Sequence, residues 1–116
     1  MSALRRIAGA VLLLLAGGAQ AQDAADPAQG QKVALNVCAA CHVVAKRQST
    51  PPILRPPAPS FTSIANRKDV SAEKIRNFVQ TTHATVGQPY NMPNPELTED
   101  QDADVAAYVM SLRKAR

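Results

Sequence analysis

The chain contains two cysteines, and both lie in the stretch Cys38-Ala39-Ala40-Cys41-His42. Two residues separate the thiols, and a histidine directly follows the second one, which is the pattern by which c-type haem is attached. This spacing lets the thiols reach two vinyl groups on one side of a porphyrin, with the neighbouring imidazole facing the iron. We therefore predict that Cys38 and Cys41 form thioether bonds to one haem c and that His42 is an axial ligand of its iron.

Three other roles for the two cysteines are open, and each leads to a protein without haem. A redox dithiol of the thioredoxin kind needs a strand that leads into the motif, and no such pattern precedes Cys38. A zinc site needs four ligands, and outside the motif only His83 remains to complete one. A disulfide across two residues closes too small a ring to restrict much of the unfolded chain.

The N-terminal residues have the pattern of a secretory signal. Arg5 and Arg6 precede the apolar run 7–16, and Ala-Gln-Ala at 19–21 is a small-x-small cleavage site. We expect residues 1–21 to be cleaved on export to the periplasm. The apolar run is shorter than the roughly 20 residues that span a bilayer, so no stable membrane insertion is expected, although an uncleaved anchor is the alternative.

The remaining domain, residues 22–116, is small and poor in aromatic residues. Loss of the two signal arginines lowers the formal net charge from +4 to +2, which gives no support for nucleic-acid binding. Two Phe, two Tyr and no Trp provide little aromatic mass for a core. Because domains of this size are marginally stable on their own burial, a covalent porphyrin would supply the missing apolar bulk.

Helix signals alternate with proline-rich stretches along this domain. Asp26 followed by Pro27 is typical of a helix start and predicts a helix to about Val37. Five prolines between His42 and Ser60 exclude a helix interior there and favour an extended loop. A short helix is expected over 61–65. A third begins after Ser71, and its apolar face consists of Ile75, Phe78 and Val79.

The last helix has the strongest signals. Thr98 and Gln101 have the spacing of a capping box, and acidic residues fill the first turn. Its apolar stripe consists of Val105, Tyr108, Val109 and Leu112. The basic residues Arg113, Lys114 and Arg116 are expected to close its C-terminal end. With no strand pattern and no repeat, we predict an all-α domain of three to four helices joined by long irregular loops.

An iron held by one histidine needs a ligand on its other face, and three side chains are candidates. Met92 lies in a proline-stiffened loop that could hold a thioether in place, which favours it as the second axial ligand. Met110 lies within the last helix, beside the core stripe, where packing is the more usual role. His83 remains open by analogy with bis-histidine haem sites.

Together these features resemble a small bacterial class I cytochrome c over essentially the whole mature chain. Gly30 stands where the family's first helix carries the glycine that lets the last helix cross it. The run 104–109 resembles the family's last helix, and Met92-Pro93 resembles the segment that presents its methionine. Ala58-Pro59-Ser60-Phe61 resembles the turn whose proline carbonyl accepts a hydrogen bond from the proximal histidine. The resemblance assigns that role to Pro59, with Pro57 and Pro52 as alternatives.

The resemblance implies a cytochrome c fold wrapped around one haem, and a periplasmic electron carrier that cycles between Fe(III) and Fe(II). With His42 and Met92 both bound, no coordination position remains open, so the protein is not expected to be an enzyme. The alternatives are a haem enzyme or gas sensor with a displaceable sixth ligand, or a dedicated electron-acceptor subunit of a periplasmic dehydrogenase.

The expected partners are redox proteins, with a dehydrogenase or reductase as donor and an oxidase or similar protein as acceptor. We expect a monomer or weak oligomer. Three cations that follow the motif, Lys46, Arg47 and Arg55, could surround an exposed haem edge and steer acidic partners. An ordinary solvated loop is the alternative for these charges.

Overall fold

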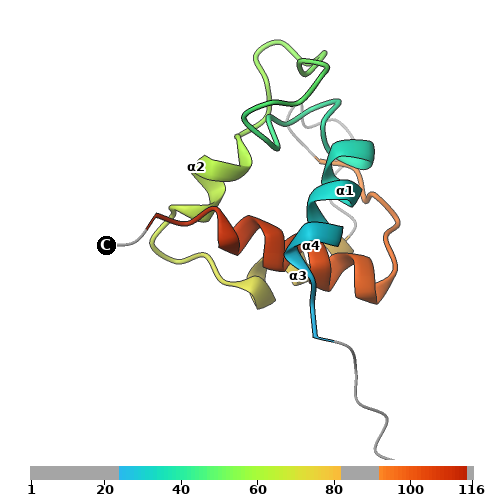
Figure 1. The fold of residues 1–116 in the computed structure, drawn as a ribbon, viewed down its shortest axis with the longest axis vertical. Coiled ribbons are helices and arrows are strands. Elements are labelled where there is room, and N and C mark those ends of the chain that lie inside the picture. The colour runs from blue at the N-terminus through green and yellow to red at the C-terminus, as the bar shows by residue number, and fades with distance from the viewer. Residues whose placement is uncertain (1–23, 82–91, 115–116) are drawn as a thin grey trace, which may run out of the picture.

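The computed structural model describes residues 24–81 and 92–114 and contains four helices in these ranges. They are α1 (Pro27–Val37), α2 (Phe61–Ala65), α3 (Ala72–Gln80) and α4 (Glu99–Ser111), shown in Figure 1. Neither described range contains a strand, which confirms the all-α prediction. The predicted signal peptide, His83 and Arg116 lie outside these ranges. No helix within them is long and apolar enough to cross a membrane.

Each helix begins at a side chain that accepts a hydrogen bond from a backbone N–H group of the first turn. The acceptors are Asp26 for α1, Ser60 for α2, Ser71 for α3 and Thr98 for α4. The Gln101 side chain also accepts a hydrogen bond from the Thr98 N–H group, which completes the predicted capping box. The predicted helix starts are therefore confirmed.

Helix α4 is the helix on which the other three described helices pack. Among the described residues, each pair of helices in contact includes α4, which packs on α1, α2 and α3. Figure 1 shows α1 and α4 crossing at the centre of the domain. Gly30 of α1 is buried at this crossing, against Asp104 and Tyr108 of α4. The expected close approach of the first and last helices at Gly30 is confirmed.

The core is small and consists largely of aliphatic side chains. Its buried members are Ala34, Val44, Phe61, Ala65, Val105, Tyr108 and Val109. The ring centroids of Phe61 and Tyr108 lie 6.3 Å apart, and those of Phe61 and His42 lie 5.5 Å apart. Both distances fall in the range of favourable aromatic contacts. The histidine of the motif is thus packed against the core of the domain.

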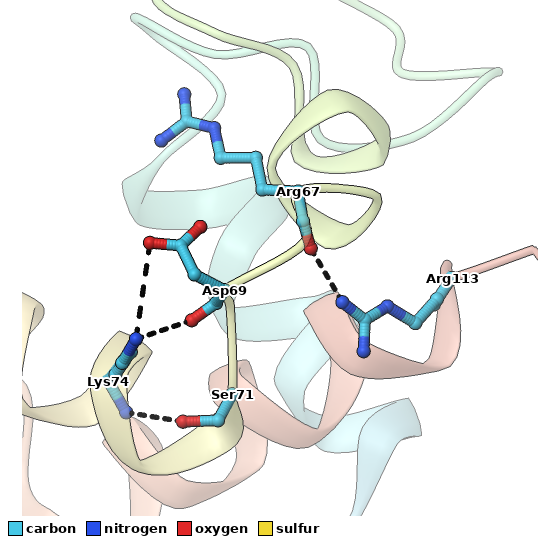
Figure 2. Close-up of polar contacts among 5 residues, drawn as sticks. All are labelled: Arg67, Asp69, Ser71, Lys74 and Arg113. Carbon is cyan, nitrogen blue, oxygen red and sulfur yellow. Dashed lines mark hydrogen bonds and ion pairs between the residues drawn. The ribbon is translucent and has the colours of Figure 1, made fainter.

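The expected role of the C-terminal cations is wrong for Arg113. Helix α4 ends at Ser111 with no basic residue in its last turn. Instead, the Arg113 guanidinium donates hydrogen bonds to the carbonyl oxygens of Ala65 (2.9 Å) and Arg67 (2.6 Å), at the end of α2. The Arg67 contact is drawn in Figure 2. A helix leaves its last carbonyl groups without hydrogen-bond partners inside the helix. Here the side chain of Arg113, far along the chain, is the partner of Ala65 in the last turn of α2 and of Arg67 just after it.

Candidate functional site

The motif forms a tight turn at the end of α1. Cys38 is the C-cap residue of this helix, and its N–H group donates to the carbonyl oxygen of Ala34. The carbonyl oxygen of Cys38 then accepts from the N–H groups of Cys41 (3.1 Å) and His42 (2.9 Å). Cys38 and Cys41 are not joined by a disulfide bond. The turn brings the two thiols and the imidazole to the wall of one cavity.

That cavity has a volume of ≈ 800 Å³ and mostly apolar walls. Its lining comes from the motif, from residues 54–59 of the long loop, from α2 and α3, from residues 92–97 and from α4. Ile75, Phe78 and Val79 of α3 all contribute, so the predicted apolar face of this helix is also a wall of the cavity. Cavities of roughly 300–1,000 Å³ hold cofactors and drug-sized ligands.

The imidazole of His42 is nearly buried, with 8% of the residue exposed. Its Nδ1–H group donates to the carbonyl oxygen of Pro59, with the two heavy atoms 2.6 Å apart. The adjacent N–H group of Ala58 donates to the carbonyl oxygen of Cys41, and His42 and Ala58 form an isolated parallel bridge. Because Nδ1 is engaged in this way, Nε2 is the nitrogen left to bind a metal.

The two methionines that are candidates for the second ligand differ in their position relative to the cavity. Met92 is half-buried and lines the same cavity as His42. Met110 is half-buried on α4 and is not part of the cavity lining. His83, the third candidate, lies outside the described residues.

The thiol of Cys38 lies among the apolar walls of the cavity. Burial, with a smaller contribution from the nearby Cys41, raises the pKa of the Cys38 thiol to about 11. The Cys38 thiol is therefore neutral at physiological pH and has no charge to stabilise inside the apolar cavity. A thioether, which is also uncharged, suits the same position.

Three charged residues at the edge of the cavity were not identified from the sequence. Arg67, Asp69 and Lys74 all line it. The ammonium group of Lys74 donates to the Asp69 carbonyl oxygen at 2.7 Å and lies 3.9 Å from the Asp69 carboxylate, as Figure 2 shows. Side-chain exposures of 63% and 83% make this ion pair a weak contribution to stability. No periodicity or motif in the sequence links these residues to the cysteines.

The three cations expected around a haem edge differ in their contacts. Lys46 and Arg47 are exposed and do not line the cavity. The Arg55 guanidinium folds back on its own loop, where it donates to the carbonyl oxygens of Pro52 and Leu54. Arg55 therefore stabilises the loop that forms part of the cavity wall.

The residues present fit a covalently attached haem. The cavity combines two free thiols, an imidazole with one nitrogen available, a thioether and apolar walls. A porphyrin needs apolar walls along its faces, and iron binds imidazole and thioether groups. Cys38, Cys41, His42 and Met92 are the residues that would hold it.

Comparison with known proteins agrees with this chemistry. The model of the cytochrome c family matches residues 27–113, which include all four helices and the motif. Cytochrome c-552 of Bradyrhizobium diazoefficiens is 36% identical over 103 residues, which cover 89% of this chain and 90% of that protein. The solved structures contain no significant match to the chain.

Proposed function

Because the chain belongs to the cytochrome c family, and so carries covalent haem c and transfers electrons, we propose that His42 and Met92 are its two axial ligands. Cys38 and Cys41 are the points of thioether attachment, and Pro59 orients the His42 ring through its carbonyl oxygen. The observation that carries this proposal is the convergence of these side chains on one apolar cavity.

The bound haem supplies a one-electron step between Fe(III) and Fe(II). With His42 and Met92 both bound to the iron, no site would remain for oxygen, peroxide or a substrate. The thioether of Met92 favours the reduced iron more than a second imidazole would. The apolar walls act in the same direction, because a low-polarity surrounding disfavours the extra positive charge of the ferric state. The protein is therefore an electron carrier without catalytic activity of its own.

The carrier works in the periplasm. The pattern of residues 1–21 supports export and cleavage after Ala21, which leaves residues 22–116 as the mature domain. Its partners are other redox proteins, a dehydrogenase or reductase that donates the electron and an oxidase or similar protein that accepts it. The match to cytochrome c-552, which covers 90% of that protein, supports an electron-carrying haem domain.

A visible and near-infrared spectrum of the protein matured in a host that attaches haem tests this proposal. The expected result is a covalent haem with sharp low-spin bands when reduced and a weak methionine-to-iron band when oxidised. Carbon monoxide should cause no rapid change. A high-spin spectrum, or rapid carbon monoxide binding, would favour a gas sensor or haem enzyme instead. Release of all haem by acidified acetone would exclude covalent attachment.

A further inference from the structure

The backbone that carries His42 is hydrogen-bonded from three separate parts of the chain. The carbonyl oxygens of Cys41 and Val43 accept from the N–H groups of Ala58 (2.9 Å) and Phe61 (3.0 Å). The carbonyl oxygen of Val44, one residue further, accepts from the Tyr108 hydroxyl of α4 at 2.6 Å. Buried backbone groups need such partners, and these contacts fix one side of the segment.

Gln48 supplies the partners on the other side. Its Oε1 atom accepts hydrogen bonds from the N–H groups of Val44 (2.7 Å) and Ala45 (3.4 Å). Its Nε2 atom donates to the carbonyl oxygens of His42 (3.4 Å) and Thr50 (2.9 Å). One half-buried amide group therefore joins the carbonyl group of His42 to the N–H groups of Val44 and Ala45 and to the carbonyl group of Thr50.

We propose that Gln48 is a positioning residue for His42, and that it tunes the reduction potential of the haem. This inference rests on the proposed ligation of the iron by His42. With Gln48 in place, all four carbonyl groups from Cys41 to Val44 have a hydrogen-bond partner. The peptide group of His42 cannot turn without breaking the contact to Gln48, and its ring is held against Pro59.

The effect on potential follows from the Nδ1–H contact of the ring. A hydrogen bond from Nδ1–H to a carbonyl oxygen makes the imidazole a more basic ligand. A more basic ligand stabilises Fe(III), which carries the higher charge, and so lowers the potential. Loss of Gln48 loosens the His42 peptide, weakens the contact to Pro59 and raises the potential.

The test compares haem-loaded Gln48→Met and Gln48→Glu with the matched change Gln29→Met at an exposed position of α1. Methionine has a similar length and makes none of the amide's hydrogen bonds. In Gln48→Met we expect the Val44 amide to exchange with solvent about tenfold faster, which corresponds to about 1.4 kcal/mol. The His42 Nδ1–H proton should also exchange faster, and the potential should rise. Gln29→Met should leave all three unchanged.

Gln48→Glu tests the hydrogen-bond acceptor of the amide separately from its donor. A carboxylate still accepts from the Val44 N–H group but cannot donate to the His42 carbonyl oxygen. We expect the Val44 amide to remain protected while the His42 Nδ1–H proton exchanges faster. If Gln48→Met fails to fold, Gln48→Glu alone tests the proposal. The proposal requires that the His42 Nδ1–H proton exchange faster in Gln48→Glu than in the wild type.

The proposal is overturned if the Gln48 variants unfold more readily but show the same exchange rate of the His42 Nδ1–H proton and the same reduction potential as Gln29→Met. Gln48 would then stabilise only the loop. The spectrum of the wild-type protein is recorded first, because it tests the proposed function separately from the positioning role of Gln48. Absence of covalent low-spin haem removes the proposed function, whereas normal haem with an unchanged Gln48→Met potential removes only the positioning role.

Discussion

Gly30 of α1 lies directly against the backbone carbonyl group of Asp104 in α4, with no room for a side chain between them. A Cβ atom added at Gly30 would overlap that carbonyl oxygen and would lie 2.8 Å from the Cβ atom of Tyr108. The Asp104 carboxylate also accepts a hydrogen bond of 2.7 Å from the N–H group of Asp26, at the start of α1. The two helices are thus joined both by close packing and by a polar contact.

We expect Gly30→Ala to destabilise the protein although alanine is the better helix former. The gain in helix propensity is about 1 kcal/mol. The overlap involves backbone, which cannot move aside as a flexible side chain would, so α1 and α4 must separate at a cost of about 2–4 kcal/mol. Denaturant unfolding of the haem-loaded protein measures the net loss. The exposed Gln29→Ala is the control, and a Gly30→Ala variant as stable as wild type would contradict the packing argument.

Met92→Ala and Met110→Ala should separate the two methionines spectroscopically. Without the Met92 thioether, we expect the near-infrared band of the oxidised protein to disappear and the reduction potential to fall. Met110, which does not line the cavity, should leave both unchanged when it is replaced. Absorption spectra and a redox titration make the comparison. Loss of the band in Met110→Ala alone would assign the ligand to α4 instead.

The carboxylate of Asp102 is an unusual feature of the packed face of α4. Only 3% of the residue is exposed, and its Oδ1 atom has no hydrogen-bond partner in the structure as described. A buried polar atom without a partner costs about 1–3 kcal/mol, more than the few tenths that an acidic residue gains near a helix start.

We therefore expect Asp102→Val to raise the free energy of unfolding by about 1–2 kcal/mol, allowing for the poorer helix propensity of valine. The control is Asp100→Val, at an exposed position of the same turn, which should lower stability slightly. Thermal unfolding of both haem-loaded variants gives the comparison. A large loss of stability in Asp102→Val would indicate that the carboxylate is needed where it lies.

Arg113→Met should loosen the segment of the cavity wall that follows α2. Arg113 donates to the carbonyl oxygens of Ala65 and Arg67, and Arg67 lines the cavity (Figure 2). We expect a loss of about 1–3 kcal/mol in the free energy of unfolding, because charged hydrogen bonds are lost from a partly buried site. Lys114→Met should cost little, since the contact of Lys114 to Asn66 is made by its backbone. Equal losses in both variants would count against a specific role for Arg113.

Local chemistry explains why the helices could be predicted from the sequence. An N-cap side chain contacts an N–H group two or three residues away, so Asp26, Ser71 and Thr98 identify their helices without any knowledge of the fold. The cysteine motif is equally local, because the spacing of Cys38, Cys41 and His42 already specifies its chemistry.

Features that depend on how the chain folds back on itself escaped prediction from the sequence. Arg113 follows α4, and a cation there is expected to interact with that helix, yet its partners lie 46 and 48 residues earlier. Gln48 lies in a proline-rich stretch without periodicity, and only the folded loop shows that its amide reaches His42. The burial of Asp102 likewise depends on how α4 packs, since acidic residues in a first turn are usually exposed.

The dependence of the described helices on α4 has a consequence for the order of synthesis and export. Helix α4 is made last, and the cysteines near the end of α1 leave the ribosome about 60 residues before it. Among the described residues, α1, α2 and α3 pack on no helix except α4, so without α4 they would lack a helix partner. Both thiols would then be accessible to an incoming porphyrin, and α4 would complete the cavity that its residues Val105 and Val109 line.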